Sequence, residues 1–290
     1  MTRSHTLTAI AATVTAMAAF AGNSILCRLA LASGSIDPAS FTALRLVSGA
    51  IALAILCSAV RRDAAIARRG SWPAAAMLFL YAIAFSYAYV NLTAASGALI
   101  LFGCVQGTMI AVALYRGDRP TFIELLGWVC AIAGLTALLL PGAKAPSLSA
   151  AVLMGIAGIA WGVYSMLGKK EPDALAATTA NFLRSVIFVL PVVAATHADA
   201  TIDTAGLLLA VSSGALTSGM GYVLWYVAVT HMTSLRAALV QLSVPAITAF
   251  GGVLLLAEPL SLRVSLSGSA ILGGVLIALV GKQKSAVSGR

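Results

Sequence analysis

The sequence predicts an all-α integral membrane protein with ten transmembrane helices, and two observations carry that prediction. Hydrophobic residues make up 60% of the 290-residue chain and charged residues only 9%, whereas a soluble domain of average composition carries about 25% charged residues. The apolar residues also gather in ten stretches of about 20 residues, the length needed to cross a bilayer. Only short loops remain between the stretches, so no soluble catalytic domain fits in the chain.

The first five stretches fill the first half of the chain. The first continues past Ala19-Phe20-Ala21, a tripeptide that resembles a signal-peptidase site, and we expect it to persist as an uncleaved helix because it exceeds a normal signal sequence. Arginines follow the second and the fourth stretch, at Arg61 and Arg116. The predicted spans are 7–32, 39–60, 72–92, 96–115 and 121–140.

The second five stretches follow a loop near residues 141–147. Lys169 and Lys170 follow the first of these five, and Pro245 lies inside the fourth, where a missing backbone hydrogen bond predicts a kink or a hinge. The predicted spans are 149–168, 175–196, 205–229, 235–257 and 262–281.

The basic residues set the expected orientation. The chain has 18 Lys and Arg residues against 9 Asp and Glu, and most of the basic residues fall in the segments on the side of the N-terminus. Cytoplasmic loops carry such an excess, so we expect a multi-pass protein of the cell's inner membrane with both termini in the cytoplasm. The net charge of +9 is thereby explained without nucleic acid. The four cysteines form no C-x-x-C pair, and we expect no metal and no cofactor.

The two halves of the chain echo each other weakly. Phe20 corresponds to Trp161, and Arg45 to Arg184, at a nearly constant separation of about 140 residues. The sequence therefore predicts two homologous units, residues 1–142 and 143–290. Because each unit holds an odd number of helices, the second must cross the membrane in the opposite sense, which is the inverted-repeat plan of many secondary transporters.

The pattern resembles the EamA-type branch of the drug/metabolite transporter superfamily over essentially the whole chain. The residues that carry the resemblance are Phe20-Ala21, Trp161-Gly162, Arg45, Arg184, Glu258-Pro259 and the glycine-rich last span of each half. The resemblance implies ten helices in two inverted five-helix repeats and alternating access around a central cavity. Within the branch the chain is most similar to YddG-type exporters, which favour aromatic amino acids.

Aromatic and amide side chains within the spans are the candidates for binding substrate. Aromatic faces that correspond between inverted halves can wall a cavity and stack on flat solutes. Buried amides must find hydrogen-bond partners, either on a substrate or between helices. The candidates of these two kinds are Asn23, Tyr81, Gln106, Trp161, Tyr164, Tyr222, Trp225 and Gln241. Tyr89 and Tyr226 are assigned instead to an interfacial aromatic belt.

Arg45 and Arg184 lie within spans, about 10–14 Å from the nearer end at a rise of about 1.5 Å per residue. A charge at such a depth is costly and points to function by default. Each arginine is a candidate to meet a substrate carboxylate on one side of the membrane. The structural alternatives are that the side chain snorkels to the headgroups or caps the carbonyls of a neighbouring helix.

The acidic residues constrain the mechanism by their positions. All nine lie in loops or within about one turn of a span end. Without a mid-membrane carboxylate, obligatory proton exchange is not expected, and movement down a substrate gradient fits better. The chain also lacks H-E-x-x-H and a membrane-embedded aspartate pair, so an intramembrane enzyme is disfavoured.

The leading function is therefore a carrier that exports small metabolites, with amino acids including aromatic ones as the expected substrates. An exporter of flat organic cations or drugs is the main alternative, because the same aromatic cavity suits both. The expected partners are the lipid bilayer and a small-molecule substrate. One copy of the chain is sufficient for transport because both repeats lie in it.

Overall fold

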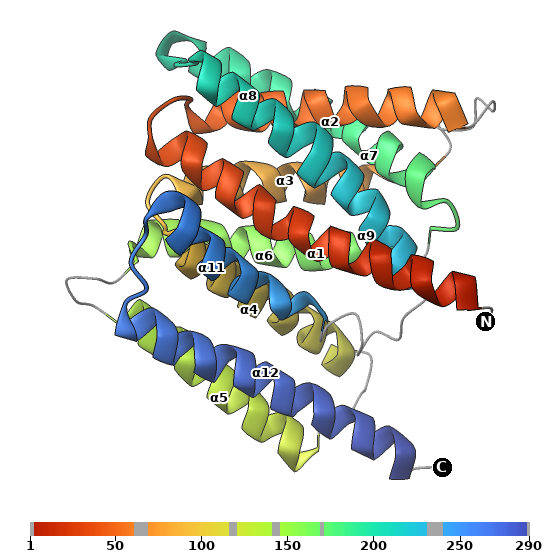
Figure 1. Ribbon diagram of the computed structural model, residues 1–290, viewed down its shortest axis with the longest axis vertical. Coiled ribbons are helices and arrows are strands. Elements are labelled where there is room, and N and C mark those ends of the chain that lie inside the picture. The colour runs from red at the N-terminus through yellow and green to blue at the C-terminus, as the bar shows by residue number, and fades with distance from the viewer. Residues whose placement is uncertain are drawn as a thin grey trace.

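The computed structural model describes residues 3–60, 69–115, 121–140, 146–168, 171–230 and 240–288. These residues form ten helical rods, as predicted (Figure 1). Their bounds are α1 Arg3–Ala32, α2 Pro38–Val60, α3 Trp72–Tyr89, α4 Ala94–Tyr115, α5 Phe122–Leu139, α6 Leu148–Gly168, α7 Ala174–Thr196, the continuous rod α8–η3–α9 Thr204–Thr230, α11 Ser243–Leu256 and α12 Leu262–Ser288. Most predicted span ends agree with these bounds to within three residues.

The eighth rod departs from a simple α-helix in its middle. Residues Ser213–Met220 are π-helical and separate α8, Thr204–Ser212, from α9, Gly221–Thr230. The predicted span 205–229 contained no sign of this change. Single π-helical turns inside α-helices occur often at functional sites, and this one contributes three hydroxyl side chains to the centre of the bundle.

The predicted span 235–257 also differs from a single helix. A turn at Leu242 precedes α11, so Pro245 lies in the first turn of that helix and not in its interior. A proline in the first turn removes no helical hydrogen bond, because the backbone N–H groups there have no partner within the helix. Residues 240–241 are helical too, so the span is broken at Leu242, three residues before Pro245 and close to the predicted kink.

The rods run back and forth along one common direction, and both termini lie at the same end of the bundle (Figure 1). Seven of the described helices are long and apolar enough to span a membrane, and three further apolar helices are shorter. Large apolar side chains on the outside of the bundle are exposed, for example Ile55 at 64% and Val129 at 63%. Such a surface requires a lipid environment.

Two helices of opposite halves organise the packing. α1 packs against the α8–η3–α9 rod and against α11, whereas α6 packs against α3 and α4. α2 packs against α7, and α5 against α12. The α5–α12 pair lies side by side at one edge of the bundle (Figure 1).

Glycines allow the α5–α12 pair to approach closely. A Cβ atom added at Gly274 would lie 2.5 Å from the backbone nitrogen of Ala131 and 2.6 Å from the carbonyl oxygen of Gly127. These backbones touch because neither glycine has a side chain, and such contacts drive helix association where no hydrophobic effect operates.

An ion pair holds one end of the bundle closed. Arg28 of α1 donates from Nε to the Oε1 atom of Glu258 at 2.7 Å, and the Oε2 atom of Glu258 accepts the backbone N–H of Ala94 at 2.7 Å. Glu258 follows Ala257, which ends α11 in the left-handed conformation with a φ of 51°. This helix end directs Glu258 toward α1 and the start of α4.

Candidate substrate-binding site

Aromatic side chains from both halves meet at the centre of the bundle. The ring of Trp161 on α6 lies 5.1 Å from the ring of Tyr81 on α3 and 4.6 Å from that of Tyr222 on α9, between centroids. Phe20 on α1 packs edge-on against Trp161 at 5.4 Å and against Trp225 at 5.9 Å. We call these five residues the aromatic cluster. Its members come from four helices that are distant in sequence.

Tyr164 extends the aromatic cluster toward α7. Its ring lies 5.5 Å from that of Trp161 and stacks on Tyr226 at 5.7 Å. Tyr226 and Tyr89 are both almost fully buried, so their assignment to an interfacial belt is wrong. The apolar exterior is supplied by other residues, and these two tyrosines pack inside the bundle.

Asn23 is the centre of a polar network beside the aromatic cluster. Its Oδ1 atom accepts hydrogen bonds from the hydroxyls of Ser213 at 2.7 Å, Thr217 at 3.3 Å and Ser218 at 3.3 Å. Its Nδ2 atom donates to the hydroxyl of Tyr81 at 3.2 Å. The π-helix makes this possible, because its wider turn brings Ser213 and Ser218, five residues apart, onto one face.

Arg45 brings a buried positive charge to the same place. It is only 1% exposed, and its guanidinium lies 5.0 Å above the ring of Tyr81. Its Nε atom donates to Ser218 at 2.9 Å, and its Nη2 atom donates to the hydroxyls of Tyr81 at 3.2 Å and Tyr222 at 2.8 Å. Its Nη1 atom has no hydrogen-bond partner, and among the described residues no carboxylate pairs with the guanidinium.

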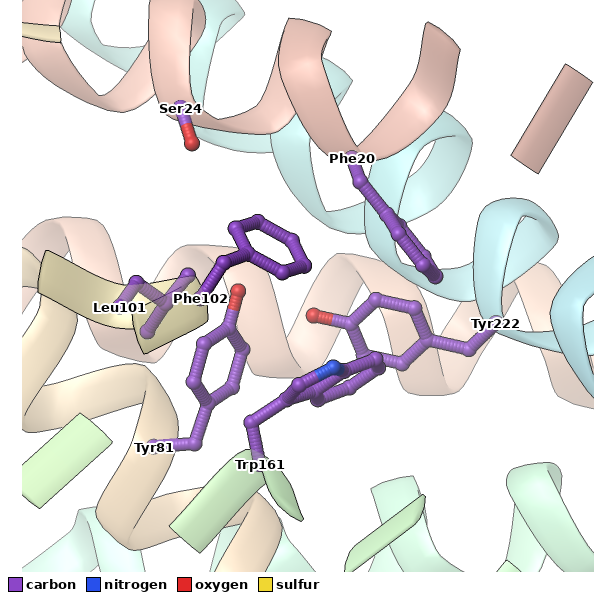
Figure 2. A pocket seen from close by; sticks show the side chains of 7 residues that line it. All are labelled: Phe20, Ser24, Tyr81, Leu101, Phe102, Trp161 and Tyr222. Atoms are coloured by element: carbon purple, nitrogen blue, oxygen red, sulfur yellow. The ribbon is translucent and has the colours of Figure 1, made fainter. Parts of the chain in front are cut away.

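A small cavity lies within the aromatic cluster (Figure 2). Its volume is about 10 Å³, the room of about one water molecule. It is lined by Phe20, Ser24, Tyr81, Leu101, Phe102, Trp161 and Tyr222, all of them buried. The buried side chains around the cavity leave no room for a larger molecule.

The structure brings seven of the ten predicted site residues into one place. Asn23, Arg45, Tyr81, Trp161, Tyr164, Tyr222 and Trp225 all belong to the aromatic cluster, to its Tyr164 extension or to the polar network beside it. The other three are Gln106, Gln241 and Arg184. Gln106 is buried in α4, and Gln241 is buried just before α11.

Arg184 has a different place from Arg45. Its Nη1 atom donates to the backbone carbonyl of Arg69 at 2.7 Å, and its guanidinium lies 5.8 Å above the ring of Trp72. Trp72 begins α3 and is 52% exposed, so Arg184 reaches the end of the bundle. This arrangement is the carbonyl-capping alternative that the sequence left open.

Sequence reasoning missed several residues that complete the site. Ser213, Thr217 and Ser218 carried no signal, because serine and threonine are common in membrane helices as local hydrogen-bonding residues. Leu101 and Phe102 are ordinary apolar residues of α4. Phe20 was noted only as the counterpart of Trp161 and was not among the predicted site residues, although it lines the cavity.

Comparisons with known proteins agree with this architecture. The model of a family described as EamA-like transporters matches residues 148–280. An uncharacterised protein of Pseudomonas aeruginosa is 52% identical over 267 residues, which cover 92% of this chain and 93% of that protein. A solved crystal structure with 18% sequence identity superposes with a TM-score of 0.67 and covers 92% of this chain and 95% of that one, which shows a shared fold.

Two more distant relatives carry names that describe transport. A protein of Streptantibioticus cattleyicolor named a probable terminal-alkyne amino-acid exporter is 24% identical over 53% of each chain. An uncharacterised transporter of Archaeoglobus fulgidus is 23% identical over 59% of this chain and 62% of its own. The helical bundle, the lipid-facing surface and these similarities lead to one conclusion: the chain belongs to the EamA-like transporter family of the drug/metabolite transporter superfamily, a family of membrane transporters and not of enzymes.

Proposed function

We propose that this transporter exports small amphipathic carboxylates, amino acids including aromatic ones among them, by alternating access around the aromatic cluster. A single observation carries the choice of substrate. Arg45 holds a positive charge at the centre of the bundle, and no described carboxylate neutralises it. An unpaired charge in a low-dielectric interior is costly, and the carboxylate of a bound substrate would offset that cost.

The aromatic cluster provides the other half of the recognition. Tyr81, Trp161 and Tyr222 present ring faces and edges to the cavity (Figure 2). An aromatic pair contributes about 0.5–1.5 kcal/mol beyond its buried area. A ligand with both a ring and a carboxylate would satisfy the rings and the guanidinium together, whereas a small aliphatic acid would satisfy only the latter.

The packing of the helices supports two inverted repeats. If residues 1–142 and 143–290 are equivalent, α1 corresponds to α6, and the α8–η3–α9 rod and α11 correspond to α3 and α4. α1 contacts the rod and α11, and α6 contacts α3 and α4. The first helix of each half therefore packs against the third and fourth helices of the other half. Reciprocal contacts of this kind allow the two halves to exchange conformations, which would open the central site to opposite sides in turn.

The family match and the amino-acid exporter add independent support. The family model covers residues 148–280, close to the proposed second repeat. The relative named a probable terminal-alkyne amino-acid exporter matches about half of the chain, and its name favours export and an amino-acid substrate here. The positive charge of Arg45 disfavours the alternative of flat organic cations, because like charges in a buried site repel.

The experiment that tests this proposal is counterflow in proteoliposomes with a panel of labelled solutes. The purified protein is expected to exchange phenylalanine, tyrosine or tryptophan saturably across the bilayer and to exclude a flat organic cation of similar size. Saturable exchange of the cation with no exchange of the amino acids would contradict the proposal. A sustained electrical current without counterflow would indicate a channel instead.

A further inference from the structure

Two phenol hydroxyls converge on the central cavity and share one cationic partner. Figure 2 shows Tyr81 and Tyr222 with their hydroxyl oxygens directed toward the same part of the cavity. The Nη2 atom of Arg45 donates to both oxygens, at 3.2 Å and 2.8 Å. One tyrosine comes from α3 and the other from α9, so the pair joins the two halves of the chain.

The hydrogen-bond directions leave one of the two phenol protons available. A phenol oxygen accepts through its lone pairs and donates through its single proton. The Tyr81 oxygen accepts from Arg45 and from Asn23, and the Tyr222 oxygen accepts from Arg45. The two hydroxyls also form a hydrogen bond with each other, which uses one of the two protons. One O–H donor therefore remains beside the cavity, and the guanidinium behind the pair strengthens it as a donor.

The acceptors of this region are occupied. The Oδ1 atom of Asn23 already accepts hydrogen bonds from the hydroxyls of Ser213 and Ser218, whereas Thr217 donates at shorter distance to the carbonyl of Ser213. No carboxylate within the described part of the chain pairs with Arg45. The region thus offers one positive charge, one free phenol proton and the unpartnered Nη1 atom of Arg45, which together are the complement of an anion. An ammonium group would find neither a negative charge nor a strong free acceptor there.

We propose that a substrate carboxylate replaces the hydrogen bond between Tyr81 and Tyr222, so that each hydroxyl donates to one carboxylate oxygen, with Arg45 as a positioning residue behind them. The inference rests on the proposed function and deepens it. The carboxylate and the ring are recognised, and an α-ammonium group is not required. Aromatic monocarboxylates without an amino group are therefore substrates in their own right, on a par with aromatic amino acids.

Four probes with the same ring separate the contribution of the carboxylate from that of the ammonium group. The probes are 3-phenylpropanoate, phenylalanine, 2-phenylethylamine and 3-phenylpropanamide, tested for direct binding to the purified protein and for counterflow. We expect 3-phenylpropanoate to bind at least as tightly as phenylalanine, and 2-phenylethylamine to bind at least about tenfold more weakly, because it lacks the group that the two donors and the guanidinium hold. Binding of phenylalanine without binding of 3-phenylpropanoate would overturn the inference, because it would make the ammonium essential.

Two conservative variants test the residues themselves. Tyr81→Phe and Tyr222→Phe remove one hydroxyl each and keep the ring. Each is expected to weaken 3-phenylpropanoate binding about tenfold, since a hydrogen bond to a charged group is lost, and to change binding of the uncharged 3-phenylpropanamide less than about twofold. Tyr87→Phe is the matched control, because Tyr87 lies on the same helix as Tyr81 but is 37% exposed.

The role of Arg45 is tested by the ratio of the affinities for 3-phenylpropanoate and 3-phenylpropanamide. Arg45→Lys keeps a charge but cannot bridge both hydroxyls through one planar group. Arg45→Gln is expected to abolish the preference for the acid over the amide, whereas Arg45→Lys is expected to keep part of it. A merely structural arginine would change the binding of both ligands equally, and that result would overturn its positioning role.

The outcomes distinguish this inference from the proposed function. If the unmodified protein exchanges none of the three charged probes, the proposed function fails and this inference fails with it. If it exchanges phenylalanine and 3-phenylpropanoate but Tyr81→Phe and Tyr222→Phe bind the acid as the unmodified protein does, the transport proposal stands and this inference alone is overturned.

Discussion

Arg45 and Asn23 show how single residues set the chemistry of the site. Both are almost fully buried, and each is satisfied mainly by hydroxyl groups and not by opposite charges. A hydroxyl can donate or accept, so it stabilises an amide or a cation without cancelling its charge. The centre of the bundle therefore remains positive, while most of its polar atoms have partners.

Trp161 packs against four other rings at the cavity, and its removal tests stacking. Trp161→Leu is expected to weaken binding of phenylalanine about fivefold more than binding of leucine. About 1 kcal/mol of ring contact is lost, and only a ligand with a ring makes that contact. Trp72→Leu is the control, since Trp72 is half exposed at the start of α3. The measurement is competitive binding of phenylalanine and leucine. An equal loss for both would assign Trp161 to packing alone.

At the scale of helices, the close packing of α5 against α12 depends on the glycines that face the partner helix and not on those that face away from it. Gly274→Ala would place a Cβ atom 2.5 Å from the backbone of Ala131, whereas a Cβ atom at Gly273 meets nothing within 4 Å. Gly274→Ala is expected to cost about 1–3 kcal/mol of stability, because the helix backbones must separate. Gly273→Ala should be neutral or slightly stabilising. Thermal unfolding in detergent compares them, and equal melting temperatures would contradict the packing argument.

Asp37 ties together two loops and predicts a pH effect. Its carboxylate accepts the backbone N–H groups of Ser40 at 2.9 Å and Thr201 at 3.1 Å, and its own N–H donates to the carbonyl of Thr201 at 3.0 Å. Partial burial opposes ionisation, but these hydrogen bonds outweigh it and hold the pKa of Asp37 below its usual value of 3.8.

A lowered pKa gives stability that is present above the unfolded value and is lost as the pH falls through the folded value. Unmodified protein should therefore lose more stability than Asp37→Asn when the pH is lowered from about 5 to about 3. Asp199→Asn, at an exposed residue of the α7–α8 connection, is the control. If the melting temperatures of the unmodified protein and of Asp37→Asn fall in parallel across this range, the lowered pKa of Asp37 is refuted.

At the scale of the whole molecule, an even number of helices brings both termini to one end (Figure 1). The basic excess on that side predicts that it is cytoplasmic. A reporter fused after Arg290 should be active only in the cytoplasm, and one inserted near Lys144 only outside it. Lys144 and several of the basic residues lie outside the described part of the chain, so this prediction rests on the sequence. A C-terminal reporter active outside the cell would contradict it.

Energy coupling is also a property of the whole bundle. The described acidic residues lie in loops or at helix ends, as Glu124 and Asp173 do at the starts of α5 and α7. No titrating carboxylate thus lies beside the central cavity in the described residues. Counterflow is expected to continue at an unchanged rate when an ionophore collapses the proton gradient while the substrate gradients are kept. Abolished counterflow under that condition would reveal a proton-binding group at the site.

The sequence by itself determined the number of helices and most of their bounds, and it named seven residues that the structure brings together at the candidate site. These follow from local physics, because about 20 apolar residues must form a helix in a bilayer, where every backbone group needs a partner. The weak correspondence between halves also identified Phe20 with Trp161, and both line the cavity.

Only the tertiary structure decided what each polar residue touches. Arg45 and Arg184 look equivalent in sequence, yet one lies behind the cavity and the other caps a carbonyl at the end of the bundle. The partners of Arg45, at Ser218 and Tyr222, are more than 170 residues away along the chain. Such contacts depend on helix rotation and on the π-helical segment, which bring distant side chains together. Helical periodicity gives the relative angles of residues along one helix but not the face that meets its neighbour.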